Sequence, residues 1–146
     1  MSDLKLDAFL PYRLSIVSNR VSAAIATAYD RMFGLKIPEW RLIAVIAEGR
    51  ALTQQALGMA TRMDKVTVSR AAQALVDRGL VVRAPNAGDR RSHLLALTET
   101  GRALYEQVAP KALEFEKVIF GVLAAEERAA LSAMLDRIEQ AAGKFE

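Results

Sequence analysis

Apolar residues recur every three or four positions over long stretches of the chain, a spacing that is typical of amphipathic helices. Residues 10–33 show it most clearly, with Leu10, Leu14, Val17 and Val21 at the start of the series. The spacing predicts six helices, over residues 10–33, 38–49, 54–60, 65–78, 99–120 and 126–142. Pro110 falls inside the fifth helix, and we expect it to kink or interrupt that helix at a cost of about 3 kcal/mol.

Two short apolar runs, 81–83 and 93–97, are too short for helices and predict β-strands. The segment between them contains Pro85, Asn86 and Gly88, which are residues that favour turns, so the two strands should form a hairpin. The order is therefore helices, one hairpin and helices again. It indicates a single domain over residues 1–146 with a mainly α fold and a small β-hairpin.

The composition excludes several kinds of chemistry. The 146 residues include one histidine and no cysteine, which excludes disulfides and thiolate metal sites. His93, the one histidine, lies in a short predicted strand, which argues against a zinc site and against a Ser–His–Asp hydrolase. The N-terminus lacks the apolar centre of a signal peptide, and no apolar run is long enough to cross a bilayer. We therefore expect a cytoplasmic protein without membrane contact, and no enzyme, metal or cofactor.

Positive charge is concentrated in the middle third of the chain. Residues 49–93 hold eight Lys or Arg against three Asp, a net charge of +5, although the whole chain carries only +3. Such a basic centre indicates a module that binds a polyanion such as double-stranded DNA. A chance excess of charge on a solvated surface would give the same numbers, so charge alone leaves both interpretations open.

The helices predicted over 54–60 and 65–78 form a helix-turn-helix candidate. Thr53 and Asp64 are good N-cap residues for the two helices. On the second helix Val68, Ala71, Ala72 and Leu75 form one stripe that should face the core. The opposite face carries Val66, Ser69, Arg70 and Gln73.

These outward residues have chemical uses at a DNA groove. Arg70 can bind guanine through two hydrogen bonds and Gln73 can pair with adenine, each worth about 1–3 kcal/mol of discrimination. Val66 can contact a thymine methyl group, while Ser69 and Thr67 can reach phosphate or a base edge. Lys65 lies at the helix N-terminus, where phosphate contacts are favoured. A helix surface with no partner would look the same, so this stretch alone is weak evidence.

The hairpin strengthens the DNA interpretation because it follows the candidate recognition helix directly, in the position of a wing. Arginine suits the narrow and electronegative minor groove. We expect Asp89 to pair with the guanidinium of Arg91 and set its direction, while Arg90 meets phosphate. The alternative is an ordinary exposed ion pair worth less than about 1 kcal/mol.

Together these features resemble the MarR (multiple antibiotic resistance regulator) family of winged-helix transcription factors, over nearly the whole chain from Tyr12 to Ile138. The stretches that carry the resemblance are "GLKIPEWRLIAVIAE", "LTQQAL", "MDKVTVSRAAQALVDRGLVVR", "GDRRSHLLALTETGRAL" and "EERAAL". It implies a winged helix-turn-helix over residues 38–97 and an obligate homodimer held by a base of N- and C-terminal helices, 10–34 and 99–142. It further implies that two recognition helices read a palindrome, with Asp89 and Arg91 as the wing-tip pair.

The resemblance also suggests an effector site. Related regulators bind small aromatic or phenolic effectors in a cleft between the dimer base and the winged helix, and Trp40 could border such a cleft. Trp40 also belongs to an apolar stripe with Ile43, Ala44 and Ala47, which favours a packing role.

The chain departs from the family pattern at a few positions. Thr61 and Arg62 stand where the family often has leucine and glycine between the two helices, and a left-handed residue other than glycine costs about 1 kcal/mol. Either a phosphate contact by Arg62 offsets this cost, or the turn has a different shape. Gly58 stands where alanine is usual, and Ala124 where Ser or Thr often caps the last helix.

The sequence thus predicts a ligand-responsive repressor that binds a pseudo-palindromic operator as a homodimer. The alternative is a DNA-binding protein without ligand sensing, either a constitutive repressor or a nucleoid-type binder. The candidate DNA-binding residues are Thr53, Gln54, Arg62, Lys65, Val66, Thr67, Ser69, Arg70, Gln73, Asp89, Arg90 and Arg91.

Overall fold

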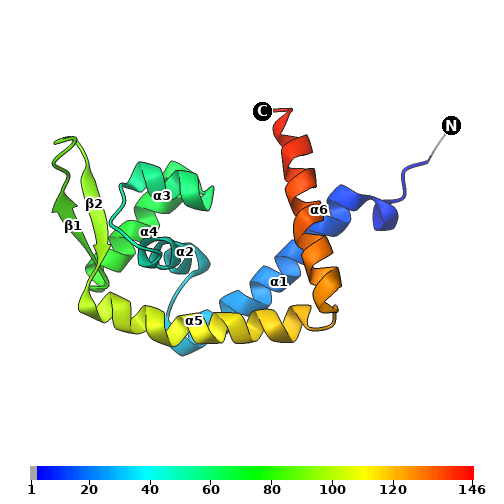
Figure 1. Ribbon diagram of the computed structural model, residues 1–146, viewed down its shortest axis with the longest axis horizontal. Helices are drawn as coiled ribbons and strands as arrows, with labels where there is room; N and C mark the ends of the chain where they lie inside the picture. Colours follow the sequence, from blue (N-terminus) through cyan, green and yellow to red (C-terminus); the bar gives the residue numbers. More distant parts are fainter. Residues whose placement is uncertain (1–2) are drawn as a thin grey trace. The chain divides into compact units, whose positions relative to one another are not determined.

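The computed structural model describes residues 3–146 and divides the chain into two compact units, Met1–Lys111 and Ala112–Glu146. The described residues form six α-helices, a short 3₁₀ helix and a two-stranded antiparallel sheet (Figure 1). Their bounds are η1 Leu6–Ala8, α1 Leu10–Phe33, α2 Ile37–Ala47, α3 Gln54–Thr61, α4 Lys65–Asp77, β1 Val81–Pro85, β2 His93–Leu97, α5 Glu99–Phe120 and α6 Ala125–Gly143. The expected mainly α fold with one hairpin is confirmed.

The helix boundaries follow from capping residues. Gly34 ends α1 in the left-handed conformation with φ 62°, and Gly79 adopts φ 72° after α4. Thr53 caps α3 by accepting a hydrogen bond from the Ala56 amide (3.1 Å). Thr98 caps α5 by accepting one from the Gly101 amide (3.0 Å). Before α6, Ala124 has no capping side chain, as expected, but its amide donates to Glu127 (2.8 Å).

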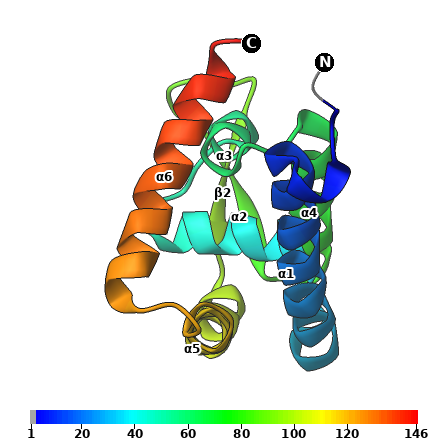
Figure 2. The same ribbon diagram turned by 90° about the vertical axis from the view of Figure 1, so that its right-hand side faces the viewer.

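The core of the first unit is formed by α2, α3, α4 and the hairpin, which lie together in both ribbon views (Figures 1 and 2). Its fully buried side chains are Leu35, Leu42, Ile43, Leu57, Val68, Leu75, Leu95 and Val108. On α2 the core residues are Leu42, Ile43 and Ile46. Trp40, Ala44 and Ala47 are only half-buried, so the stripe predicted for this helix is rotated from the one observed.

The hairpin is anchored by more than its own two strands. β1 and β2 pair in register from Val81 opposite Leu97 to Pro85 opposite His93, so β1 is two residues longer than predicted. Leu52, between α2 and α3, adds an isolated antiparallel bridge to Leu95, with backbone hydrogen bonds of 2.8 and 3.2 Å. This bridge was not predicted, and it ties the hairpin to the segment that leads into α3.

Pro110 does not interrupt α5. The helix is continuous from Glu99 to Phe120 with the proline inside it. Proline removes one backbone donor, so the carbonyl of Glu106 loses its usual partner within the helix. Of the two expected effects the interruption is therefore wrong, and the kink stays a prediction.

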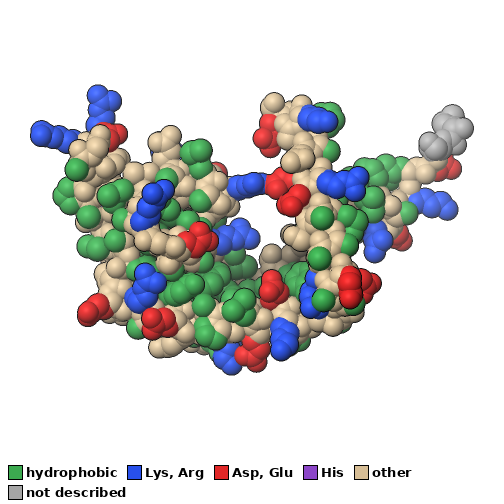
Figure 3. All heavy atoms as spheres, in the orientation of Figure 1, with side chains coloured by type: hydrophobic (Ala, Val, Ile, Leu, Met, Phe, Trp, Pro, Cys, Tyr) green, Lys and Arg blue, Asp and Glu red, His purple; other side chains and the backbone are tan. Residues whose placement is uncertain are grey.

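Several helices keep large apolar side chains at the surface of their own unit. In the first unit, Leu10 of α1 is 72% exposed and Val17 is 54% exposed, and Figure 3 shows hydrophobic side chains along this helix. In the second unit, Met134, Leu135 and Ile138 of α6 are each at least 43% exposed. No helix among residues 3–146 combines the length and apolar character that crossing a membrane requires.

Two glycines provide a test of the packing. A Cβ at Gly101 would overlap the backbone carbonyl of Leu80, which cannot move without shifting β1. We expect Gly101→Ala to lower the free energy of unfolding by about 3 kcal/mol or more. At Gly58, inside α3, the nearest atom to such a Cβ is the Met63 carbonyl oxygen at 3.5 Å, an ordinary contact. Gly58→Ala should therefore raise the free energy of unfolding by about 0.5–1 kcal/mol.

Urea denaturation of both variants measures these changes, with Gly143→Ala as the control because nothing lies within 4 Å of a Cβ there. Equal effects of Gly101→Ala and Gly58→Ala would contradict the packing described above.

Candidate nucleic-acid interface

The N-terminus of α4 is built by Asp64, whose carboxylate accepts hydrogen bonds from both the amide and the hydroxyl of Thr67 (2.8 Å each). These bonds, first that from the backbone amide, lower the pKa of the exposed Asp64 carboxyl below its ordinary value. Because the folded-state pKa is lowered, the capping contribution is present above the ordinary carboxyl pKa and is lost as the pH falls through the lowered one. The hydroxyl of Thr67 is thus already used within the protein.

The two faces of α4 match the sequence prediction. The residues predicted for the core, Val68, Ala71, Ala72 and Leu75, are its buried residues. Val66, which is 57% exposed, together with Ser69, Arg70 and Gln73, lies on the solvent side. Gln73 has a partner there, since its amide nitrogen donates a hydrogen bond to Asp77 (2.7 Å). This bond, between residues one helical turn apart, uses one of the two amide hydrogens of Gln73 and leaves the other hydrogen and the amide oxygen for a further partner.

Arg62 forms the turn between α3 and α4. It is the C-cap of α3 with φ 57° and ψ 32°, and it is the non-glycine residue that has a positive φ within the described chain. The left-handed conformation expected at this position is therefore present despite the missing glycine. The strain is local to the turn that sets the angle between the two helices.

The hairpin tip is organised around two short side chains rather than an ion pair. Asp89 accepts a hydrogen bond from the backbone amide of Arg91 (2.9 Å), and Asn86 accepts one from the amide of Gly88 (3.1 Å) and donates to Ser92 (3.0 Å). Within residues 3–146 no ion pair joins Asp89 to the guanidinium of Arg91. The expected side-chain pair is therefore replaced by an Asx-type turn, in which the carboxylate satisfies the backbone.

A groove of about 510 Å³ connects these parts. It is lined by Thr53 and Gln54 of the α3 N-terminus, by Lys65 of α4, and by Asp89 and Arg91 of the hairpin. Figure 3 shows Lys and Arg side chains projecting from the hairpin tip, where Arg90 and Arg91 are exposed. Residues far apart in the sequence thus share one basic surface.

The fold also matches solved structures of known regulators. A MarR/EmrR family transcriptional regulator from Acinetobacter sp. ADP1 has a TM-score of 0.88 and is 25% identical, with 97% of this chain and 99% of that chain covered. The sequence pattern that describes the MarR family matches residues 33–92 of this chain.

Curated relatives of this chain are transcriptional regulators as well. The HTH-type transcriptional regulator PecS of Dickeya dadantii (strain 3937) is 30% identical over 128 residues, which cover 84% of this chain and 77% of PecS. The chain belongs to the MarR family of transcriptional regulators. The HTH-type transcriptional repressor NicR of Pseudomonas putida is 35% identical over 86 residues, which cover 59% of this chain and 54% of NicR, so the match spans about half of that relative's length.

Within this MarR-family chain the groove contains residues that the sequence analysis missed. Arg83, Asn86, Ser92 and His93 also line it. Arg83 lies on β1 opposite Leu95. Because alternate residues of a strand share a face, Arg83 lies on the same face as the buried Val81, and this face is the one toward the groove. The alternation could therefore have identified Arg83 from the sequence. Asn86 and Ser92 bond across the tip of the hairpin, a contact that spacing alone does not reveal.

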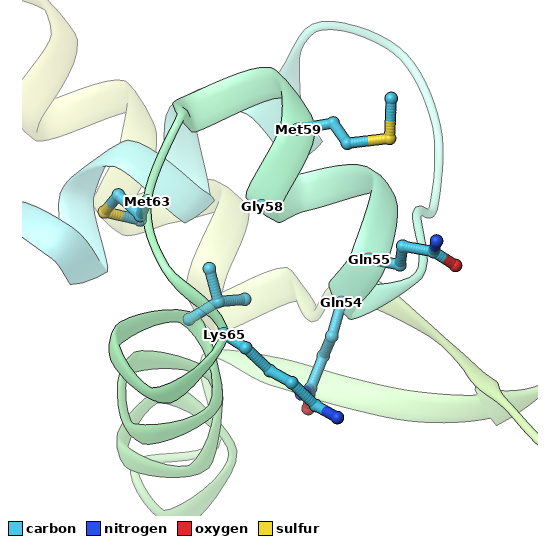
Figure 4. Close-up of a pocket in the computed structure, with 7 residues that line it drawn as sticks. Gln54, Gln55, Gly58, Met59, Met63 and Lys65 are labelled. Carbon is cyan, nitrogen blue, oxygen red and sulfur yellow. The ribbon is translucent and has the colours of Figure 1, made fainter. Parts of the chain in front are cut away.

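A second hollow of about 610 Å³ lies between α3 and the start of α4 (Figure 4). Gly58, Met59, Met63 and Val68 give it apolar walls. Gln54 and Lys65 line both this hollow and the groove, and Figure 4 shows the ends of their side chains converging. The two residues therefore mark the boundary between the helix-turn-helix and the hairpin side of the surface.

The turn at Arg62 yields a test that separates backbone strain from binding. Arg62→Gly and Arg62→Ala both remove the guanidinium, but only glycine relieves the left-handed backbone. We expect the glycine variant to be more stable than the alanine variant by about 1 kcal/mol in urea denaturation. Both variants should weaken DNA binding equally in fluorescence anisotropy, relative to the wild type. Equal stability of the two would show that the turn is not strained.

Proposed function

We propose that the chain is a homodimeric transcriptional repressor that binds a pseudo-palindromic operator and releases it when a small aromatic effector binds. The observation that carries the DNA-binding part is the basic groove from Lys65 at the α4 N-terminus to Arg91 at the hairpin tip. Family membership supports DNA binding and transcriptional control. The other ten candidate residues, from Thr53 to Arg90, are proposed to act around this groove in the roles that the sequence predicts, except that Asp89 holds the backbone of Arg91 and not its guanidinium.

The exposed apolar side chains of α1 and α6 support the homodimer. Leu10, Leu14, Val17, Met134 and Ile138 are each at least 48% exposed. Burying such surfaces stabilises a protein by about 25 cal/mol per Å² of apolar area, so long helices of this kind favour a partner. A second copy of the chain supplies the same surfaces, as symmetric oligomers require.

Selection of bound fragments from random-sequence DNA tests the DNA-binding and dimer parts together. We expect enrichment of a pseudo-palindrome whose half-sites lie about 10 bp apart, since each of two α4 helices enters one major groove. The selected sequence should bind at least about 10³-fold more tightly than random DNA.

Enrichment of a single half-site would contradict the dimer, and no enrichment at all would favour the alternative of a nucleoid-type binder. A constitutive repressor would give the same enrichment as a ligand-responsive one, so the effector needs a separate experiment.

An aromatic cluster supports the effector part of the proposal. Trp40 of α2 stacks on Tyr105 of α5 with ring centroids 5.8 Å apart, and it meets the edge of Tyr29 of α1 at 5.9 Å. The guanidinium of Arg102 lies 6.0 Å from the centre of the Tyr105 ring. Flat apolar faces beside a cation suit an aromatic carboxylate. Trp40 and Tyr105 are half-buried, so part of the cluster is accessible.

Trp40 is the only tryptophan, so intrinsic fluorescence reports on this cluster. We expect benzoate or salicylate to change the Trp40 emission over the same concentration range in which it releases a labelled operator, because binding to one state shifts the population. Sodium acetate at equal concentration is the control for ionic strength. Release by acetate and benzoate alike, without an emission change, would contradict aromatic sensing.

A further inference from the structure

Arg78, directly after α4, connects the recognition helix to α1. Its guanidinium donates one hydrogen bond to the carbonyl of Gly34 (2.9 Å) and another to the carbonyl of Phe33 (3.1 Å). Phe33 is the last residue of α1 and Gly34 is its C-cap. We call this pair of bonds the Arg78 fork. It spans 44 and 45 residues of sequence.

The acceptors of the fork are well suited to a cation. The last carbonyls of a helix have no partner within the helix and carry the negative end of its dipole. The left-handed Gly34, with φ 62°, turns the chain away and leaves room for the guanidinium, whose Nη2 lies 3.8 Å from where a Cβ would be. A planar guanidinium presents two nitrogens in a fixed geometry to two carbonyls, whereas the lysine ammonium is a single nitrogen on a flexible stem.

Few other contacts fix α1 to the winged helix. Tyr29 is the buried residue of the helix, at 2% exposure, and it packs against Trp40. The residues of α1 before Val21 are exposed within this chain. The buried and half-buried residues of α1 lie from Val21 onward, so the direction of α1 relative to α4 depends on this second half of the helix, whose last residues the Arg78 fork holds.

We propose that Arg78 is a positioning residue for operator binding that acts without touching DNA. This inference rests on the proposed function, in which α1 belongs to the dimer base and α4 reads a half-site. The fork then fixes α4 to the dimer base, and so fixes the spacing of the two recognition helices. Arg78 lies at the far end of α4, roughly 20 Å from the N-terminal residues that face the groove, at 1.5 Å per residue.

Operators with altered half-site spacing test the proposal. The selected operator, versions with the half-sites moved by one and two base pairs, and an isolated half-site are titrated with wild-type, Arg78→Ala and Arg78→Lys protein. In the wild type, the selected spacing should bind most tightly. In Arg78→Ala the preference for that spacing should fall about tenfold, equivalent to about 1.4 kcal/mol. Its affinity for the isolated half-site and its salt dependence should stay as in the wild type.

Two further variants make the result specific. Arg78→Lys keeps the charge but replaces the two rigid nitrogens of the fork with one flexible ammonium, so most of the spacing preference should be lost, as in Arg78→Ala. Arg91→Ala is the comparison for a DNA contact, and it should weaken binding to all the DNAs and reduce the salt slope by about one. Circular dichroism confirms that each variant is folded. If Arg78→Ala does not fold, Arg78→Lys is compared with the wild type in its place.

Three results would overturn the proposal. An unchanged spacing preference in Arg78→Ala would show that the fork does not position α4. Equal loss on every DNA together with a lower salt slope would make Arg78 a phosphate contact, and wild-type behaviour of Arg78→Lys would show that the two-nitrogen geometry of the fork does not set the spacing. A wild-type protein with no preferred spacing would instead refute the proposed dimeric reading of DNA, and the positioning role would fall with it.

Discussion

The direction in which the exposed residues of α4 point depends on the burial of the other face of that helix. Val68, Ala71, Ala72 and Leu75 are at most 5% exposed, and α2 and α3 pack against this side. Two of the four are alanines, whose small side chains let neighbouring helices approach closely. Since successive residues of a helix are 100° apart, fixing these four also fixes the direction of Val66, Ser69, Arg70 and Gln73. The surface proposed to face DNA is thus oriented by apolar packing and not by the polar residues that carry it.

The same packing determines where the hairpin lies. Gly79 ends α4 with φ 72°, and the next two residues, Leu80 and Val81, are buried at 4% and 2% exposure. The hydroxyl of Thr98 donates to the Gly79 carbonyl (2.6 Å), and Gly101 packs directly on the Leu80 backbone. The end of α4, the start of β1 and the start of α5 therefore meet at one corner, so the hairpin tip cannot swing without disturbing α5.

Local features were predictable from the sequence, because they depend on residues close together in the chain. The helix periods, the caps Thr53 and Asp64, and the faces of α4 belong to this class. The left-handed conformation at Arg62 was one of two shapes left open for this turn, and the structure shows which one is present. Contacts across many residues were not predictable: the Leu52–Leu95 bridge and the Arg78 fork join segments 43 to 45 residues apart, and no periodicity indicates such a pair. Pro110 shows the opposite error, since a local preference against helix was overcome by the rest of α5.

The side chains of α4 and those of the hairpin tip are held by different kinds of hydrogen bond within the protein. On α4, Thr67 and Gln73 donate to Asp64 and Asp77, so both side chains are held by bonds within the protein before they meet a base. The hydrogen-bonding groups that remain on them contribute a net free energy only where a base offers a well-placed partner. At the hairpin, Asp89 holds the backbone of Arg91 and leaves the guanidinium to adapt, and contact with phosphate or the minor groove needs no exact base. In the proposed complex the helix would therefore contribute mainly discrimination between sequences, whereas the hairpin would contribute mainly affinity that depends on salt.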